Sequence, residues 1–267
     1  MSSRLVDYPS SDESSSDHGH HSESSSNNKQ DYCEESEPKE PETGPSRDIS
    51  AERQEDERND VGHVQGGWAG RVFLEVDAGQ QLEQFGRQCM DKLRLEARSK
   101  RSCAEALQII GSQEMHSSEE LHISLTRPFY AQEHQIPAFV EALQTSLVGY
   151  GRFAVGFERV STYVNERGNR GFIALDVGAG RTGLAGLLDR VDRVMGRMGK
   201  RRFYSRPRFH ISLAWMRVNG EQQIKALEMA GEWLGTAMQE EILYLAATQI
   251  DTVVCVFGNK QFSISLG

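Results

Sequence analysis

The chain has 267 residues and a formal net charge of −9 at pH 7, from 39 acidic and 30 basic side chains. It has no run of about 18 apolar residues, the length that crosses a bilayer as a helix, and its start has neither the basic residues nor the apolar segment of a secretory signal. We therefore expect a protein of the cytosol or nucleus with no membrane partner. The four cysteines include no Cys-x-x-Cys pair, which argues against a disulfide framework and a cysteine zinc site.

The negative charge is concentrated at one end of the chain. Residues 1–60 carry 17 Asp or Glu and 6 Lys or Arg, a net of −11, so the remaining residues carry +2. The same 60 residues include 14 serines and only 8 apolar residues, too few to bury a surface that offsets the entropy of ordering. The composition predicts a disordered, acidic, serine-rich tail over residues 1–64. We expect the folded domain, residues 65–267, to be active without it.

The folded part alternates strand and helix patterns, which are recognised by apolar periods of two and of three to four residues. The first half predicts a strand at 71–76, a helix at 80–98, an apolar element of undecided type at 103–110, a strand at 121–127, a helix at 133–148, and a hairpin of strands 153–163 and 171–177. The second half predicts a helix at 182–199, a strand at 209–215, a helix at 221–238, and strands at 242–250, 252–257 and 262–266. This mixture indicates an α+β fold with antiparallel sheets.

The most specific feature is a repeated motif. The sequence His-Ile-Ser-Leu occurs at 122–125 and again at 210–213, so that the two histidines are 88 residues apart. Successive side chains of a strand point to opposite faces. Each copy therefore buries its apolar residues and presents one imidazole and one hydroxyl side by side on the other face.

Two such pairs suit group transfer at a phosphodiester. One neutral imidazole, of His122 or His210, can take a proton from an attacking hydroxyl while the other, protonated, gives one to the leaving oxygen. The hydroxyls of Ser124 and Ser212 can donate to the non-bridging phosphate oxygens, where negative charge accumulates. The four side chains therefore supply an acid, a base and a phosphate clamp, with no need for a metal or cofactor.

The motif has two other interpretations, a polar strand face next to solvent and a zinc site. A single His-x-Ser strand is usually only a polar face next to solvent, but two copies in halves of similar element order favour catalysis. A zinc site at His122 and His210 lacks a third ligand at suitable spacing, and serine is a poor zinc ligand.

The sequence resembles the 2H phosphoesterases, which are named for two His-x-Ser/Thr motifs in two pseudo-symmetric lobes around a central cleft. Within them it is most similar to the branch that trims the 3′ end of spliceosomal U6 small nuclear RNA. The resemblance covers about residues 65–267, and the acidic start is also similar. It rests on the segments 122–125, 163–165, 172–177, 191–195, 203–204 and 209–215.

The resemblance implies a two-lobed fold and a 3′-to-5′ RNA exonuclease that works by transesterification and leaves a 2′,3′-cyclic phosphate. It implies a nuclear protein whose partner is a single-stranded RNA 3′ end, and we expect a monomer. Our preferred assignment makes His210 the base and His122 the acid. The alternatives are a 2H enzyme for a cyclic nucleotide or a 2′,5′-linked oligonucleotide, and an RNA 3′-end binding module without catalysis.

Substrate contacts are expected near the second motif. Seven basic residues and no acidic residue lie between 193 and 208, either as a solvated helix end or as a phosphate-binding surface. The resemblance implies that Tyr204, inside this run, stacks on the terminal base. It also assigns nucleotide contacts to Arg208, Glu166, Ile123 and Ile211. A carboxylate at position 166 would repel phosphate if it pointed into the site.

Overall fold

The computed structural model describes residues 66–77, 79–98, 109–110, 115–118 and 120–267, which belong to one compact unit of the chain. The predicted tail over 1–64 and most of the apolar element at 103–110 lie outside these residues. Every strand pairing in the described part is antiparallel, and helices accompany the strands, which confirms the α+β prediction. None of the described helices is long and apolar enough to span a bilayer.

The elements follow the predicted order closely. The strands are β1 (Gly67–Glu75), β2 (His116–Ser117), β3 (His122–Ser124), β4 (Phe129–Gln132), β5 (Phe153–Val155), β6 (Phe157–Val164), β7 (Arg170–Val177), β8 (His210–Arg217), β9 (Thr248–Ile250), β10 (Thr252–Phe257) and β11 (Lys260–Ser265). The helices are α2 (Gly79–Ala97), the 3-10 turn η1 (Glu133–Gln135), α4 (Ile136–Leu147), α5 (Arg181–Arg197), α6 (Glu221–Ala237) and α7 (Gln239–Ile242).

One large antiparallel sheet joins the two halves of the described chain. Its strand order is β11-β10-β1-β3-β8-β7-β6, with β4 beside β1 and β2 beside β8. Strands β3 and β8, which carry the two histidine motifs, are neighbours at the centre of this order. The sheet therefore brings together two segments that lie 88 residues apart in the sequence.

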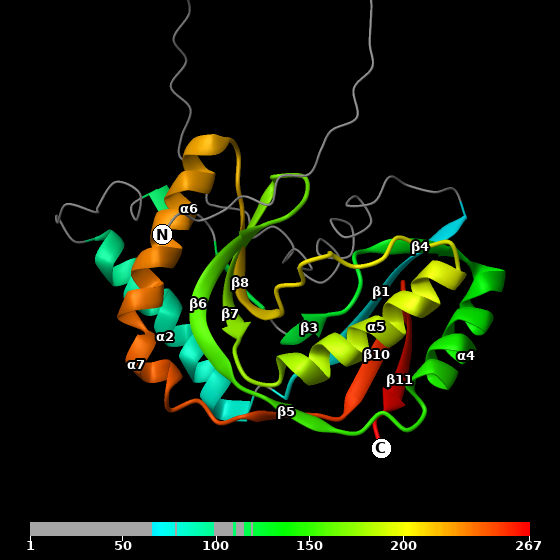
Figure 1. The fold of residues 1–267 in the computed structure, drawn as a ribbon. Helices are drawn as coiled ribbons and strands as arrows, with labels where there is room; N and C mark the ends of the chain where they lie inside the picture. Colours follow the sequence, from blue (N-terminus) through cyan, green and yellow to red (C-terminus); the bar gives the residue numbers. More distant parts are fainter. Residues whose placement is uncertain (1–65, 78, 99–108, 111–114, 119) are drawn as a thin grey trace, which may run out of the picture. The chain divides into compact units, whose positions relative to one another are not determined.

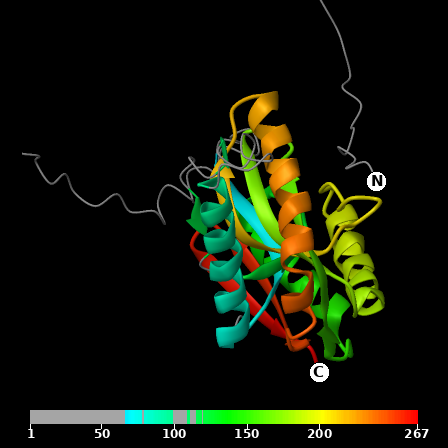
Figure 2. The same ribbon diagram turned by 90° about the vertical axis from the view of Figure 1, so that its left-hand side faces the viewer.

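Helices cover one face of this sheet. Phe139 of α4 contacts Phe257, which is paired with Gly70 on the same face as Leu74 and Ile123. Helices α4 and α5 lie over the part formed by β1, β10 and β11 (Figure 1). Helices α2 and α6 lie side by side over the other part (Figure 2). The polar side chains of β3 and β8 lie on the opposite face.

Two predicted strands differ from the structure. The prediction of one strand over 153–163 is wrong, because the chain is interrupted at Gly156. Strand β5 then pairs with β9 in a separate two-stranded sheet, while β6 joins the main sheet. The predicted strand over 242–250 is also wrong for its first part, since α7 ends at Ile242 and only Thr248–Ile250 is extended.

The second difference has a tertiary cause. Lys92 of α2 donates to the carbonyl of Ala237 at 2.8 Å and pairs with Glu241 at 2.6 Å, so the end of α6 and the helical turn of α7 are tied to α2. The apolar residues that follow, Leu243 and Tyr244, are about 80% exposed instead of lying in a sheet. An apolar run alone could not reveal these contacts.

The packing of α6 on β6 gives the first prediction. A Cβ atom on Gly231 would lie 2.6 Å from Cγ2 and 2.7 Å from Oγ1 of Thr162, a β-branched side chain with little freedom to move. We expect Gly231→Ala to lower the free energy of unfolding by about 1–3 kcal/mol, measured by urea denaturation.

The matched control is a glycine in α2. A Cβ on Gly86 would meet nothing closer than Leu213 at 3.8 Å. Gly86→Ala should therefore stabilise the protein by about 0.5–1 kcal/mol through helix propensity. Equal effects of the two substitutions would contradict this description of the α6–β6 contact.

Candidate active site

A row of four buried aliphatic residues crosses the centre of the sheet. Ile123 of β3 is paired with Ile211 of β8, Leu74 of β1 with Ile123, and Leu175 of β7 with Ile211. All four side chains are 0% exposed. Residues directly opposite one another share a face, so this row fixes which side chains of β3 and β8 point the other way.

The four motif side chains therefore lie together on the opposite face. With Ile123 opposite Ile211, the antiparallel count places His122 opposite Ser212 and Ser124 opposite His210. All four are half-buried. Side chains opposite or diagonal across two strands lie within about 4.5–8 Å of each other, the range over which four groups can surround one phosphate. We call these four residues the His/Ser quartet.

Both imidazoles are held in the same way. Nδ1 of His122 lies 3.0 Å from the carbonyl oxygen of Glu120, and Nδ1 of His210 lies 2.8 Å from that of Arg208. A carbonyl oxygen can only accept, so Nδ1 donates its hydrogen in each case. Nε2 is then the atom that exchanges protons, as acceptor in the neutral ring and as donor in the protonated ring.

The surroundings of the two histidines differ. His210 stacks on Tyr163 of β6, with ring centroids 4.0 Å apart and planes at 14°. His122 faces Phe73 of β1 at 5.1 Å and a tilt of 59°. Burial lowers the pKa of His210, Arg208 lowers it further, and the hydrogen bond to the Arg208 carbonyl and the charge of Asp176 partly oppose this. The neutral form of the His210 ring is therefore favoured.

A second cluster bridges the segment after β3 and the turn after β6. Arg127, whose side chain is 9% exposed, donates to Glu166 at 2.7 Å and lies 3.8 Å from the ring centre of Tyr204. The hydroxyl of Tyr204 donates to the same carboxylate oxygen at 3.0 Å, and Arg201 lies 3.8 Å from the other. The negative charge of Glu166 is therefore balanced by two guanidinium groups.

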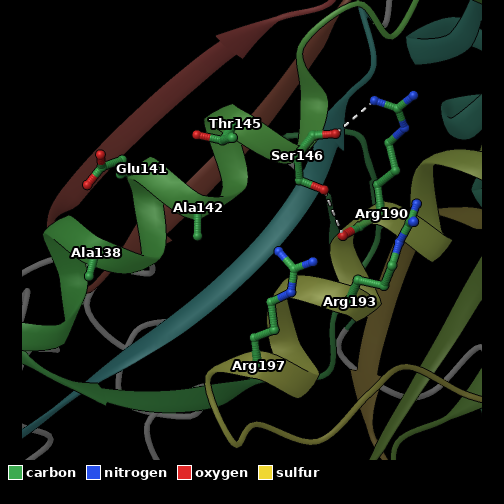
Figure 3. A pocket seen from close by; sticks show the side chains of 8 residues that line it. All are labelled: Ala138, Glu141, Ala142, Thr145, Ser146, Arg190, Arg193 and Arg197. Atoms are coloured by element: carbon green, nitrogen blue, oxygen red, sulfur yellow. Dashed lines mark hydrogen bonds between the residues drawn. The ribbon is translucent and has the colours of Figure 1, made fainter.

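The basic residues of 193–208 do not form one surface. Arg208 lies over the Tyr163 ring at 4.6 Å, and Arg201 reaches Glu166, so these two are near the quartet or Tyr204. Arg193 and Arg197 instead line a groove between α4 and α5, beside Arg190 (Figure 3). Arg190 donates to the carbonyl of Ser146 and so joins the two helices. The expected phosphate-binding run is thus divided between the site and the helix-covered side.

The packing limits how Ile123 and Ile211, two of the expected nucleotide contacts, can reach a ligand. The side chains of Ile123 and Ile211 are fully buried, so any nucleotide contact from these residues has to come from the main chain. In the part of the chain that the structure describes, no group of three or more His, Cys, Asp or Glu side chains could hold a metal ion.

Three residues of this region were given no role by the sequence. Arg127 lies two positions after the first motif, as Arg208 lies two positions before the second, and this proximity was its only signal. Tyr163 and Asp176 lie in segments that carry the family resemblance, but their contacts depend on strand pairings that one sequence does not reveal. Arg127 contacts Tyr204 and Glu166, Tyr163 stacks on His210, and the charge of Asp176 acts on His210.

Comparison with known proteins identifies the family of the chain. The family model HVSL, described as an uncharacterised conserved protein, matches residues 31–265. U6 snRNA phosphodiesterase 1 of Drosophila melanogaster is 30% identical over 206 residues, 76% of this chain and 72% of the relative. The rat protein of the same name is 28% identical over 210 residues, 76% and 71% of the two chains.

Solved structures show the same fold. Usb1 of Kluyveromyces marxianus, in a structure with uridine monophosphate, superimposes with a TM-score of 0.56 and 12% identity over 76% of this chain and 100% of that chain. A second structure of that Usb1 gives a TM-score of 0.54 with 13% identity. The chain therefore belongs to the HVSL family, together with the U6 snRNA phosphodiesterase 1 proteins, and has the 2H phosphoesterase fold.

Proposed function

We propose that this protein is a phosphodiesterase that shortens the 3′ end of U6 small nuclear RNA, in the 3′-to-5′ direction and without a metal ion. The observation that carries the proposal is the His/Ser quartet, because it places two imidazoles with the same Nδ1 anchoring on one face of two neighbouring strands. The names of the relatives support the choice of RNA. The protein acts as a monomer in the nucleus, with residues 1–64 as a tail outside the catalytic domain 65–267.

The reaction is a transesterification. Nε2 of His210 takes the proton of the penultimate ribose 2′-hydroxyl, and the 2′-oxygen attacks the last phosphorus. Nε2 of His122 gives its proton to the O5′ atom as the P–O5′ bond breaks. The products are the terminal nucleoside and an RNA that ends in a 2′,3′-cyclic phosphate. Ser124 and Ser212 donate hydrogen bonds to the non-bridging oxygens as charge builds on them.

The electrostatics support His210 as the base. Its pKa is lowered, mainly by burial, so its ring stays neutral at pH values where an ordinary histidine begins to be protonated. Of the charged groups that act on it, Arg208 lowers its pKa and Asp176 raises it, and Asp176 is itself paired with Arg159 and Arg208. On β1, the carboxylate Glu75 is paired with His122, and Glu120 lies two positions before it in the sequence.

The terminal base has a suitable platform in Tyr204. Arg127 covers one face of the ring, and Glu166 holds the hydroxyl, so the ring is fixed before a base arrives. A preorganised aromatic ring loses little entropy when a base stacks on it. Arg201 adds positive charge beside Glu166 for the phosphate backbone.

The central experiment uses an oligonucleotide with 3′-terminal uridines, incubated in EDTA. We expect the wild-type protein to shorten it stepwise, and His122→Ala and His210→Ala to abolish shortening, because each removes one half of the proton transfer. Products are resolved on denaturing gels, and mass spectrometry identifies the cyclic phosphate.

A substrate with hydrogen in place of the penultimate 2′-hydroxyl provides the chemical control. Transesterification requires that hydroxyl as nucleophile, so this substrate should bind without being cut. Cleavage of the 2′-deoxy substrate, or loss of wild-type activity on chelation, would disprove the mechanism. A wild-type protein that binds RNA but leaves it intact would indicate a binding module instead.

The base platform is tested by Tyr204→Ala. Stacking on an aromatic side chain is worth about 1–3 kcal/mol per base, so kcat/KM on a uridine-ended RNA should fall by about 5- to 150-fold. Tyr204→Phe keeps the ring and should retain most of the activity. The matched control is Tyr244→Ala, which truncates a tyrosine that is 82% exposed at the end of α7. An equal loss in the Tyr204 and Tyr244 variants would refute the platform.

A further inference from the structure

A buried carboxylate that the reaction does not use lies beside His210. Asp176 of β7 is paired with His210 in the sheet and is 3% exposed. Its oxygens accept hydrogen bonds from the hydroxyl of Tyr163 at 2.6 Å, the hydroxyl of Ser161 at 2.8 Å and Nε of Arg159 at 3.0 Å. Arg208 lies 3.5 Å away as a further ion pair. These donors hold the pKa of Asp176 below its ordinary value despite its burial.

Two of these partners also contact His210. Tyr163 stacks flat on the imidazole, and the Arg208 main chain accepts the hydrogen bond from its Nδ1. The hydroxyl of Tyr163 remains protonated, because burial and the neighbouring carboxylate raise its pKa. From its buried position, Asp176 therefore holds Tyr163, whose ring covers His210, and Arg208, whose main chain orients the imidazole.

The carboxylate and the ring beside His122 differ from those beside His210. The pseudo-twofold relation between β3 and β8 makes Glu75, which is paired with His122, the counterpart of Asp176. Glu75 is exposed, and the ring beside His122 is Phe73, which has no hydroxyl for a carboxylate to hold. The two histidine motifs are equivalent in sequence, but the carboxylate and the ring described beside each of them differ in this way.

We propose that Asp176 is a positioning residue that makes His210 the base of the pair, by holding Tyr163 against the imidazole and Arg208 beside it. The ring then excludes water from one side of the imidazole and keeps Nε2 directed toward the phosphate. This inference rests on the proposed function for its catalytic meaning, but the arrangement around His210 is testable in the free protein.

The direction in which the pKa of His210 changes distinguishes a positioning role of Asp176 from a direct effect of its charge. The titratable and charged groups beside His210 are Asp176 on β7, Tyr163 on β6 and Arg208 on the preceding segment. Arg159 on β6 pairs with Asp176. Burial is the largest cause of the lowered pKa of His210, and the negative charge of Asp176 opposes it only in part. If Asp176 acted through its charge alone, Asp176→Asn would lower that pKa further. If it acts by holding Tyr163 in place, the same change admits water and raises the pKa.

The experiment measures the imidazole pKa values of the full-length protein by NMR, with the His210 signal assigned from the His210→Gln variant. We expect Tyr163→Ala and Asp176→Asn both to raise the pKa of His210. Tyr163→Phe keeps the ring and every charge but loses the hydrogen bond to Asp176, so it should raise the pKa less. Phe73→Ala, the matched ring truncation beside His122, should leave the pKa of His210 unchanged.

Kinetics on a short RNA provide the second readout. Asp176→Asn should reduce kcat by about 10- to 100-fold, as loss of an orienting partner does, with KM little changed. The acidic limb of the pH–rate profile should move to higher pH in Asp176→Asn and Tyr163→Ala. Thermal melting confirms folding, and Tyr163→Phe serves if Asp176→Asn does not fold.

The outcomes are distinct. A lower or unchanged pKa of His210 in Asp176→Asn, or an unchanged value in Tyr163→Ala, would overturn the positioning role. So would a shift of equal size and sign in Phe73→Ala. Failure of the wild-type protein to cleave RNA would count against the proposed function, while the NMR titrations would still decide the role of Asp176.

Discussion

The pairing of Ile123 with Ile211 is the constraint on which the site depends. It is the contact at which β3 meets β8, and both side chains are fully buried between Leu74 and Leu175. Because side chains alternate along a strand, burial of this row places His122, Ser124, His210 and Ser212 on the opposite face. A slip of one residue in either strand would bury a histidine and expose an isoleucine, so the apolar core sets the geometry of the polar site.

The sheet holds the two histidines in the same way but gives them different neighbours. The main chain holds the two imidazoles alike, through Nδ1 and the carbonyl two residues earlier. Their neighbours on the flanking strands β7 and β1 differ, with Asp176 buried among donors on one side and Glu75 exposed on the other. An acid–base reaction needs two groups of the same type in different protonation states. A duplicated motif with unequal surroundings meets that need.

Much of this could be predicted from the sequence, because it depends on local patterns. Alternation around positions 122–125 and 210–213 was sufficient to place each His-x-Ser pair on one face, and helical spacing located α2, α4, α5 and α6. The positions that could not be predicted depend on contacts between distant segments. Lys92 contacts Glu241 in the helical turn that replaces the expected strand at 242, Arg127 contacts Glu166 39 residues later, and Asp176 contacts Tyr163 across a strand pair.

The central claim is that both histidines act on one phosphate, and it can be measured without turnover. A dinucleotide lacking the penultimate 2′-hydroxyl is titrated into the protein while NMR follows the imidazole signals of His122 and His210. The account predicts that both signals shift along one saturation curve, because one phosphate contacts both rings. A shift of only one histidine, or two curves with different midpoints, would contradict it.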